Sequence, residues 1–199
     1  MPTTQQTRAR GRPRAFDKEN AVETAMRLFH ARGYDAVGVA ELGTELGIRP
    51  PSFYAAFGNK AGLFAEALER YYNSDANIFS IASEPKGSVI EVIERTLMLA
   101  AQTYPEHDGV AGCLVLDGTR NTTDPEARAL TAAAKQAGRD AIRAFIATEY
   151  RDRAEELSQF VAIAMAGMSA AARDGADEAT LRAFAANIIR AFRREVEAT

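Results

Sequence analysis

The stretch GIRPPSFYAAFGNK, residues 47–60, leaves room for only one short helix between two chain breaks. Proline is tolerated in the first turn of a helix because the N–H that it lacks has no helical partner there. The paired prolines therefore predict a helix that begins at Pro50 and ends near Phe57. A second short helix is expected over 39–46, and Gly47 suits the left-handed turn between the two. Helices joined in this way form a helix-turn-helix or, alternatively, a purely structural helix corner.

The rest of the chain is also patterned for helices. Apolar residues make up 47% of the 199 residues, which indicates a folded globular protein. Alanine is abundant, β-branched runs are scarce and no strand-like alternation persists, so the predicted fold is all-α. We expect about nine helices, near residues 17–32, 39–46, 50–57, 60–80, 88–104, 113–116, 125–148, 152–173 and 177–197.

Local signals set several helix boundaries. Asp17 and Asn59 are predicted N-caps, because their side chains can accept hydrogen bonds from the first turn. Thr123 precedes Glu126 by three residues, which suggests a capping box at the start of the helix expected over 125–148. Gly62 occupies the third position of the helix that follows Asn59, where a glutamate would support the cap. A loose start is therefore expected for that helix.

The charges are unevenly distributed. Residues 1–70 carry ten Lys and Arg against eight Asp and Glu, whereas residues 71–199 carry fourteen against nineteen. The positive excess lies at the very start of the chain. A basic tip on an acidic body indicates local contact with a polyanion. We expect three segments: a flexible basic arm over 1–15, a helix-turn-helix domain over 16–60 and a helical domain over 61–199.

Several classes of protein are disfavoured. The N-terminus lacks the apolar segment of a signal peptide, and the apolar run 160–172 is too short to span a bilayer, so no membrane association is expected. Cys113 is the only cysteine and forms no internal disulfide, which favours the cytoplasm. His107, between Glu106 and Asp108, has no second cluster to complete a metal site. Without a nucleophile–base pair or a phosphate loop, we expect neither an enzyme nor a cofactor.

Residues 17–64 resemble the DNA-binding domain of the TetR (tetracycline-repressor) family of bacterial regulators. The resemblance rests on AMRLFHARGYDAVGVAELGTELGI followed by PPSFYAAFGNKAGLF, about a quarter of the chain. It implies a cytoplasmic homodimeric repressor that a small-molecule effector releases from a palindromic double-stranded DNA operator. The helical domain over 61–199 would then bind the effector and form the dimer.

The resemblance also implies which residues contact DNA. Tyr54 and Lys60 occupy phosphate-contact positions, whereas Phe53 and Phe57 occupy core positions. Arg49 stands where a capping side chain is usual and can instead contact a guanine edge or a phosphate. The remaining expected DNA contacts are Gly38 and Val39, where backbone N–H groups replace a missing Ser or Thr cap, together with Pro50, Pro51 and Ser52.

The basic arm allows two interpretations. In RGRPR, Arg12 and Arg14 either enter a narrow A·T minor groove or belong to a solvated tail that adds only salt-dependent affinity.

The second half of the chain supplies candidates for the effector site and the dimer interface, each with ordinary core packing as the alternative. Cys113 is either a buried core thiol or a redox or electrophile sensor that replaces reversible effector binding. The effector-pocket candidates are Met98, Tyr104, Cys113, Leu116, Phe145, Phe160, Met165 and Met168. The dimer-interface candidates are Ala164, Gly167, Ala171, Leu181, Phe184, Ile188 and Phe192.

Overall fold

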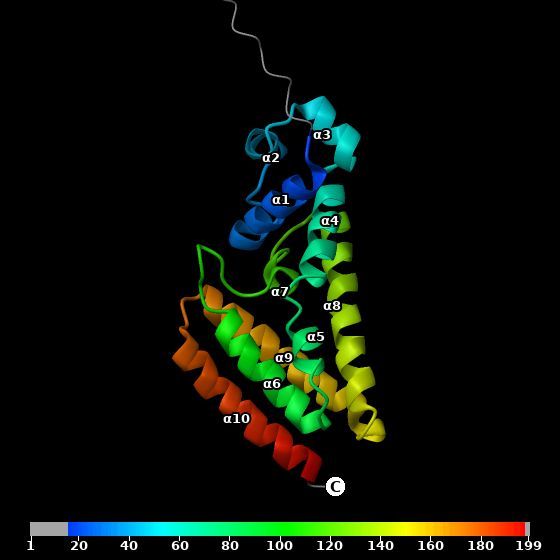
Figure 1. Ribbon diagram of the computed structural model, residues 1–199, viewed down its shortest axis with the longest axis vertical. Helices are drawn as coiled ribbons and strands as arrows, with labels where there is room; N and C mark the ends of the chain where they lie inside the picture. Colours follow the sequence, from blue (N-terminus) through cyan, green and yellow to red (C-terminus); the bar gives the residue numbers. More distant parts are fainter. Residues whose placement is uncertain (1–15, 198–199) are drawn as a thin grey trace, which may run out of the picture.

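The computed structural model describes residues 16–197, and these residues form an all-α fold (Figure 1). The only β pairing among them is an isolated bridge between His107 and Val110. The helices are α1 (Lys18–Arg32), α2 (Val39–Glu45), α3 (Pro50–Phe57), α4 (Lys60–Tyr72), α5 (Ile78–Ser83), α6 (Val89–Thr103), α7 (Leu114–Asp117), α8 (Pro125–Ile146), a 3-10 turn (Arg151–Arg153), α9 (Ala154–Arg173) and α10 (Glu178–Glu197).

The first three helices form one end of the molecule (Figure 1). Asp17 caps α1 by accepting a hydrogen bond from Asn20 N, and α3 begins at Pro50, as the sequence predicts. Gly47 adopts a φ of 64°, the left-handed conformation expected between α2 and α3. A core of fully buried side chains fixes the angles between these helices, and it comprises Phe29, Leu42, Phe53 and Phe64.

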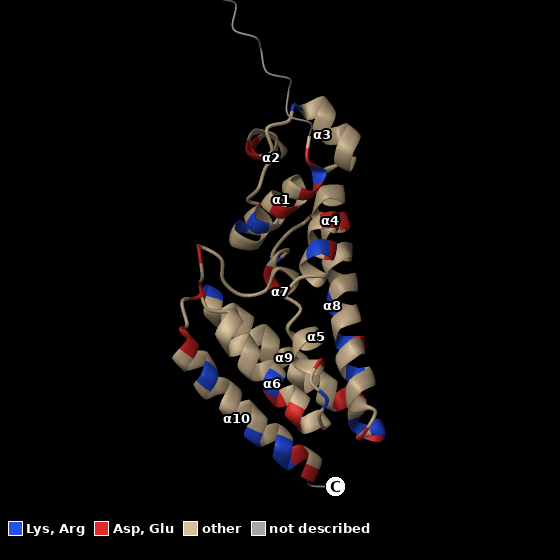
Figure 2. Cartoon of the chain, viewed as in Figure 1, with Lys and Arg blue, Asp and Glu red and all other residues tan. Residues whose placement is uncertain are grey.

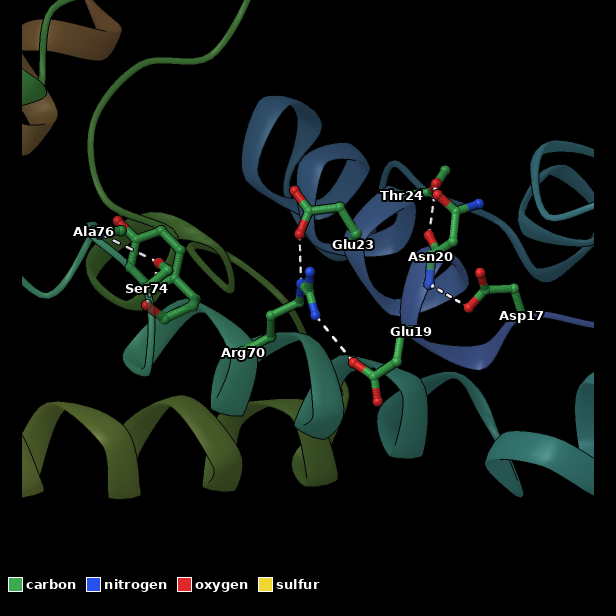
Figure 3. A network of polar contacts seen from close by, with 9 residues as sticks. Asp17, Glu19, Asn20, Glu23, Thr24, Arg70, Ser74 and Ala76 are labelled. Carbon is green, nitrogen blue, oxygen red and sulfur yellow. Dashed lines mark hydrogen bonds and ion pairs between the residues drawn. The ribbon is translucent and has the colours of Figure 1, made fainter.

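Helix α4 joins this end to the rest of the fold and packs along α1. Arg70 of α4 donates to Glu23 of α1 and also pairs with Glu19 at 3.1 Å, as Figure 3 shows. Nearer the start of both helices, Lys18 Nζ lies 2.8 Å from Glu66 Oε1. Exposed ion pairs contribute little free energy individually, so their effect is to set how α1 lies against α4.

The body consists of long helices packed side by side. Helix α10 lies along α6, and α8 lies along α9 (Figure 1). A capping box starts α6, in which Ser88 Oγ accepts from Glu91 N and the Glu91 carboxylate accepts from Ser88 N. No helix in the range 16–197 has the length and apolar character needed to cross a bilayer.

Three expectations about helix boundaries are wrong. The predicted helix over 60–80 ends at Tyr72, and a separate α5 follows. Side chains of the intervening NSDAN segment bond the last carbonyls of α4 instead, since Ser74 Oγ donates to Tyr71 O and Asn77 Nδ2 donates to Tyr72 O. The structure consequently has ten α-helices among residues 16–197, one more than the nine or so expected.

The other two errors concern helix starts. The N-cap of α8 is Asp124, whose carboxylate accepts from the N–H groups of Glu126 and Ala127, so Thr123 forms no capping box. The start of α4 is tight, because Asn59 Oδ1 accepts from Gly62 N at 2.6 Å. A Cβ on Gly62 would lie only 2.1 Å from Phe57 O, so glycine here permits the close approach of α3 and α4.

Candidate functional site

Helix α3 has one exposed face and one buried face. Phe53 is fully buried and Phe57 nearly so, whereas Tyr54 is 52% exposed and Ser52 is also exposed. The Tyr54 ring packs edge-on against Phe53, with 5.6 Å between ring centroids. The buried phenylalanines therefore hold the backbone while Ser52 and Tyr54 remain free to contact another molecule.

The start of α3 has few backbone donors. Pro50 and Pro51 have no N–H, and the N–H of Phe53 already donates to Arg49 O at 3.0 Å. Only the N–H groups of Arg49 and Ser52 lack a helical partner in this first turn. Arg49 is the N-cap residue and its side chain forms no capping bond. Contacts at this helix start thus depend on side chains and on these two N–H groups.

Charge around α3 is concentrated at its two ends. The helix itself carries no charged residue, as Figure 2 shows, while Arg49 precedes it and Lys60 follows it. The Lys60 ammonium lies 3.9 Å from the centroid of the Tyr34 ring, a cation–π contact. Partial burial lowers the pKa of Lys60, although the nearby carboxylates of Asp35 and Asp124 oppose this shift.

The remaining predicted DNA contacts vary in accessibility. Gly38 is the exposed N-cap of α2 and offers no side-chain cap, as expected, and Val39 is half-buried. Pro50 and Pro51 are exposed beside Ser52. The candidates Arg12 and Arg14, and the whole of the predicted arm 1–15, lie outside the described residues.

Hydrogen bonds fasten this end of the molecule to the segment before α8. Tyr34 Oη donates to Asp124 Oδ2 at 2.8 Å, and Tyr34 N donates to Gly118 O at 2.7 Å. Thr122 Oγ1 donates to Asp35 Oδ1 at 2.5 Å. The segment after α1 is therefore in direct polar contact with the segment before α8, in addition to the covalent connection through α4.

His30 is the second point of contact between α1 and the body. Its Nε2 lies 3.0 Å from Gly112 O, and Arg173 Nη2 of α9 donates to His30 O at 2.8 Å. The His30 ring also packs edge-on against Tyr71 of α4. Burial lowers the pKa of His30, so the neutral imidazole donates through Nε2 to the carbonyl.

The buried carboxylate of Asp117 lies beside Arg173, the residue that contacts His30. Ser169 Oγ donates to Asp117 Oδ2 at 2.5 Å, and Arg120 Nη2 lies 2.6 Å from Asp117 Oδ1. Arg173 Nε, 3.4 Å from Asp117 Oδ2, is buried and has no hydrogen bond within the described residues. Sequence reasoning missed this cluster, and the only signal for it was an aspartate directly after the apolar run CLVL.

A cavity of about 530 Å³ opens between α4, α5, α7, α8 and α9. Four of the eight pocket candidates line it, namely Tyr104, Cys113, Leu116 and Met165. The other four lie outside its wall because they pack elsewhere: Met168 lies in the core and Met98 packs against it, Phe145 contacts Phe79, and Phe160 contacts Phe192.

Sequence reasoning missed much of the cavity wall. The α5 segment contributes Ile78 and Phe79, which the expected continuous helix over 60–80 had concealed. Lys135 and Arg139 of α8 also line the cavity. They are spaced by four residues and therefore lie on one face of the helix, which is the signal that could have identified them.

Cys113 has the properties of a core thiol. It is 8% exposed, and burial raises its pKa, an effect that a hydrogen bond with Tyr71 opposes. Reactive cysteines instead have a lowered pKa and an electropositive, accessible setting. No cluster of potential metal ligands is found within residues 16–197.

The dimer-interface candidates fall into two groups. Leu181 and Phe192 are buried within the protomer, as is Ala164, so intrachain packing accounts for these three. The others are at least partly accessible, and they are Gly167, Ala171, Phe184 and Ile188. Ile163 of α9 was not among the candidates, yet it is 72% exposed. Accessible apolar side chains thus lie on both α9 and α10.

The fold and the helix-turn-helix define an all-α regulatory protein, and comparison with known proteins gives the family. The sequence profile of the bacterial regulatory proteins of the tetR family matches residues 21–67. The HTH-type transcriptional repressor BdcR of Escherichia coli (strain K12) is 41% identical over 175 residues, 88% of each chain. The HTH-type transcriptional repressor ComR of the same organism is 30% identical over 197 residues, 92% of each chain.

A solved structure agrees with these relatives. A cysteine variant of the TetR-family transcriptional regulator CifR, complexed with a 26-bp double-strand operator DNA, is 33% identical and has a TM-score of 0.79. The match covers 91% of this chain and 99% of that one. The protein described here belongs to the tetR family of bacterial regulatory proteins.

Proposed function

We propose that the chain is a homodimeric transcriptional repressor that binds a palindromic operator through α3 and is released by a small molecule in the cavity. The observation that carries the proposal is the outer face of α3, where Ser52 and Tyr54 are exposed above buried phenylalanines. The N-terminal part of such a helix enters the major groove in helix-turn-helix proteins. Arg49, Ser52 and Tyr54 supply side-chain donors for base edges and phosphates.

Lys60 is proposed as a phosphate contact. In the structure its ammonium rests on the Tyr34 ring, and the segment that holds Tyr34 is bonded to Asp124. A phosphate at the start of α4 would be favoured by the lysine and by the helix dipole together. Its binding would draw the ammonium away from Tyr34, so DNA contact and the junction with the body would be linked at this residue.

The dimer is proposed to form through the accessible apolar residues of α9 and α10. Phe184 is 41% exposed on α10, and Gly167 and Ile163 are exposed on α9. A two-fold axis at this face would place a copy of α3 in each of two half-sites separated by one or more helical turns of DNA.

Release is proposed to act through Tyr71. This residue lines the cavity, and its ring also packs against His30 of α1 at 5.2 Å between centroids. An effector that moves Tyr71 would disturb the contacts that set α1 against the body, and with them the separation of the two α3 helices. The effector must bind the released state more tightly than the DNA-bound state for this shift to occur.

Selection of bound sequences from a random duplex library tests the proposal, using purified protein at near-physiological salt. Enrichment of a palindrome with two half-sites is the expected result, and its spacing gives the separation of the α3 helices. Absence of any enriched sequence from a folded dimer, both alone and after removal of bound small molecules, would contradict the proposed function.

A further inference from the structure

The cavity wall carries positive charge without negative charge. Among the described residues that line it, Lys135 and Arg139 are the only charged ones, and no Asp or Glu is present. Most of the remaining wall is apolar, including Ile78, Phe79 and Leu116. A cation in such surroundings loses hydration, and proteins ordinarily offset this loss with a nearby carboxylate.

Neither cation forms an ion pair with a carboxylate within residues 16–197. Lys135 forms no ion pair or hydrogen bond there, and Arg139 bonds only to the neutral side chain of Gln136. The next arginine along α8 differs sharply. Arg143 does not line the cavity, and it pairs with Asp140 at 2.9 Å and with Glu155 at 3.2 Å.

The surroundings of Lys135 compensate its charge only in part. Burial lowers its pKa, and the positive charges of Arg120 and Arg139 act in the same direction. Asp117 and Cys113 oppose the shift. Asp117 is already engaged by Ser169 and Arg120, however, and burial keeps the Cys113 thiol protonated by raising its pKa.

We propose that the cavity binds a small amphipathic organic anion, whose negative group lies between Lys135 and Arg139 and whose apolar part fills the rest of the space. This inference rests on the proposed function in taking the cavity as the effector site. Two cations one helical turn apart on α8 can contact one anionic group together. A volume of about 530 Å³ lies within the range of about 300–1,000 Å³ that is usual for small-molecule pockets.

The phenol groups in the wall add no negative charge to it. Burial raises the pKa values of Tyr71 and Tyr104, so both phenols stay neutral. A cationic ligand would meet two like charges and no carboxylate, which disfavours it. A neutral ligand would leave both cations partly desolvated without a partner.

Three probes of equal length test the charge preference: octanoate, octanamide and octylammonium. Direct binding to the full-length protein, measured by calorimetry without DNA, is expected to be strongest for octanoate. The amide is expected to bind about tenfold more weakly, and the ammonium not measurably. Equal binding of the carboxylate and the amide, preference for the ammonium, or no binding of octanoate and of its ten-carbon homologue would each overturn the proposal.

Variants identify the residues responsible. Lys135→Met is expected to weaken octanoate binding about tenfold while it changes octanamide binding less than about twofold. Arg143→Gln is the matched control on the same helix, and it should leave both affinities unchanged. An equal loss for both probes in Lys135→Met would overturn the assignment. Because DNA is absent from the binding measurement, its result does not depend on the duplex selection. If the anion proposal fails, the DNA-binding proposal can still be tested, and the reverse also holds.

Discussion

Gly62 sets the spacing between the DNA-binding end and α4. The backbone of Phe57, at the end of α3, lies where any side chain at this position would project. The same glycine donates its N–H to the Asn59 cap. One missing side chain thus permits both the tight turn and the capping bond that follow α3.

Gly62→Ala is expected to destabilise the protein by about 1–3 kcal/mol, because the added methyl group overlaps Phe57 O and the helices must separate. Denaturant unfolding measures the change. Gly138→Ala is the control, since a Cβ there has no neighbour within 4 Å and alanine favours a helix interior. That variant should gain about 0.5–1 kcal/mol. Equal stability of Gly62→Ala and the wild type would contradict the close approach.

His30 makes the junction sensitive to pH. Its folded-state pKa lies below the ordinary value of 6.5, mainly because of burial, with Arg173 acting in the same direction and Asp117 against it. Between the two pKa values the unfolded chain binds more protons than the folded one. The free energy of unfolding therefore falls as pH decreases through this window, and the stabilisation is fully present above 6.5.

His30→Gln is expected to flatten this pH dependence, since the amide can still donate to Gly112 O but does not titrate. Thermal unfolding across pH 5–8, the range of histidine titration, measures the slope. His107→Gln, at an exposed loop residue, is the control and should keep the slope of the wild type. A wild-type slope that survives in His30→Gln would show that His30 is not its source.

At the scale of elements, the start of α3 lacks a stabilising side-chain cap and has an accessible arginine in its place. Arg49 cannot accept a hydrogen bond, so the Ser52 N–H stays uncapped. A serine at position 49 would supply this bond. The proposed contact of Arg49 with DNA explains why this helix of eight residues lacks a side-chain cap.

Arg49→Ser is therefore expected to change stability and DNA affinity in opposite directions. Capping should raise the free energy of unfolding by about 0.5–2 kcal/mol. Loss of the guanidinium should weaken binding to the selected duplex about tenfold and make it less dependent on salt. Unchanged affinity and salt dependence would remove Arg49 from the proposed interface.

The elements also show what the sequence can predict. Helix α3 was predictable to the residue because Pro50 and Phe57 lie between strong breaks. The end of α4 was not, because helical periodicity persists through residues whose side chains bond the local backbone instead. The N-cap of α8 was placed one residue early, since Thr123 and Asp124 are both good capping residues.

At the scale of the whole molecule, the sequence predicted the DNA-binding end better than the cavity. A helix-turn-helix is built from contiguous residues, whereas the cavity wall combines residues of five helices spread over residues 71–166. Periodicity identifies an apolar face but not whether that face meets a core or a void. Met168 and Leu116 look alike in sequence for this reason, although only Leu116 lines the cavity.

The proposed dimerisation through α9 and α10 predicts a large effect of charge at one position. Phe184→Glu should yield a folded monomer that loses specific DNA binding, because the partner helices would have to bury an unpaired carboxylate. Sedimentation measures the oligomeric state and circular dichroism the fold. Phe184→Leu keeps an apolar side chain and should remain dimeric. A Phe184→Glu protein that stays dimeric would place the interface elsewhere.

The affinity of Tyr54→Phe for the selected duplex tests most directly the central claim that α3 binds DNA. The variant keeps the ring that packs on Phe53 and removes one exposed hydroxyl, so the melting temperature should not change. Fluorescence anisotropy should show about tenfold weaker binding, the loss of one hydrogen bond to a charged phosphate. Unchanged affinity at an unchanged melting temperature would contradict the claim.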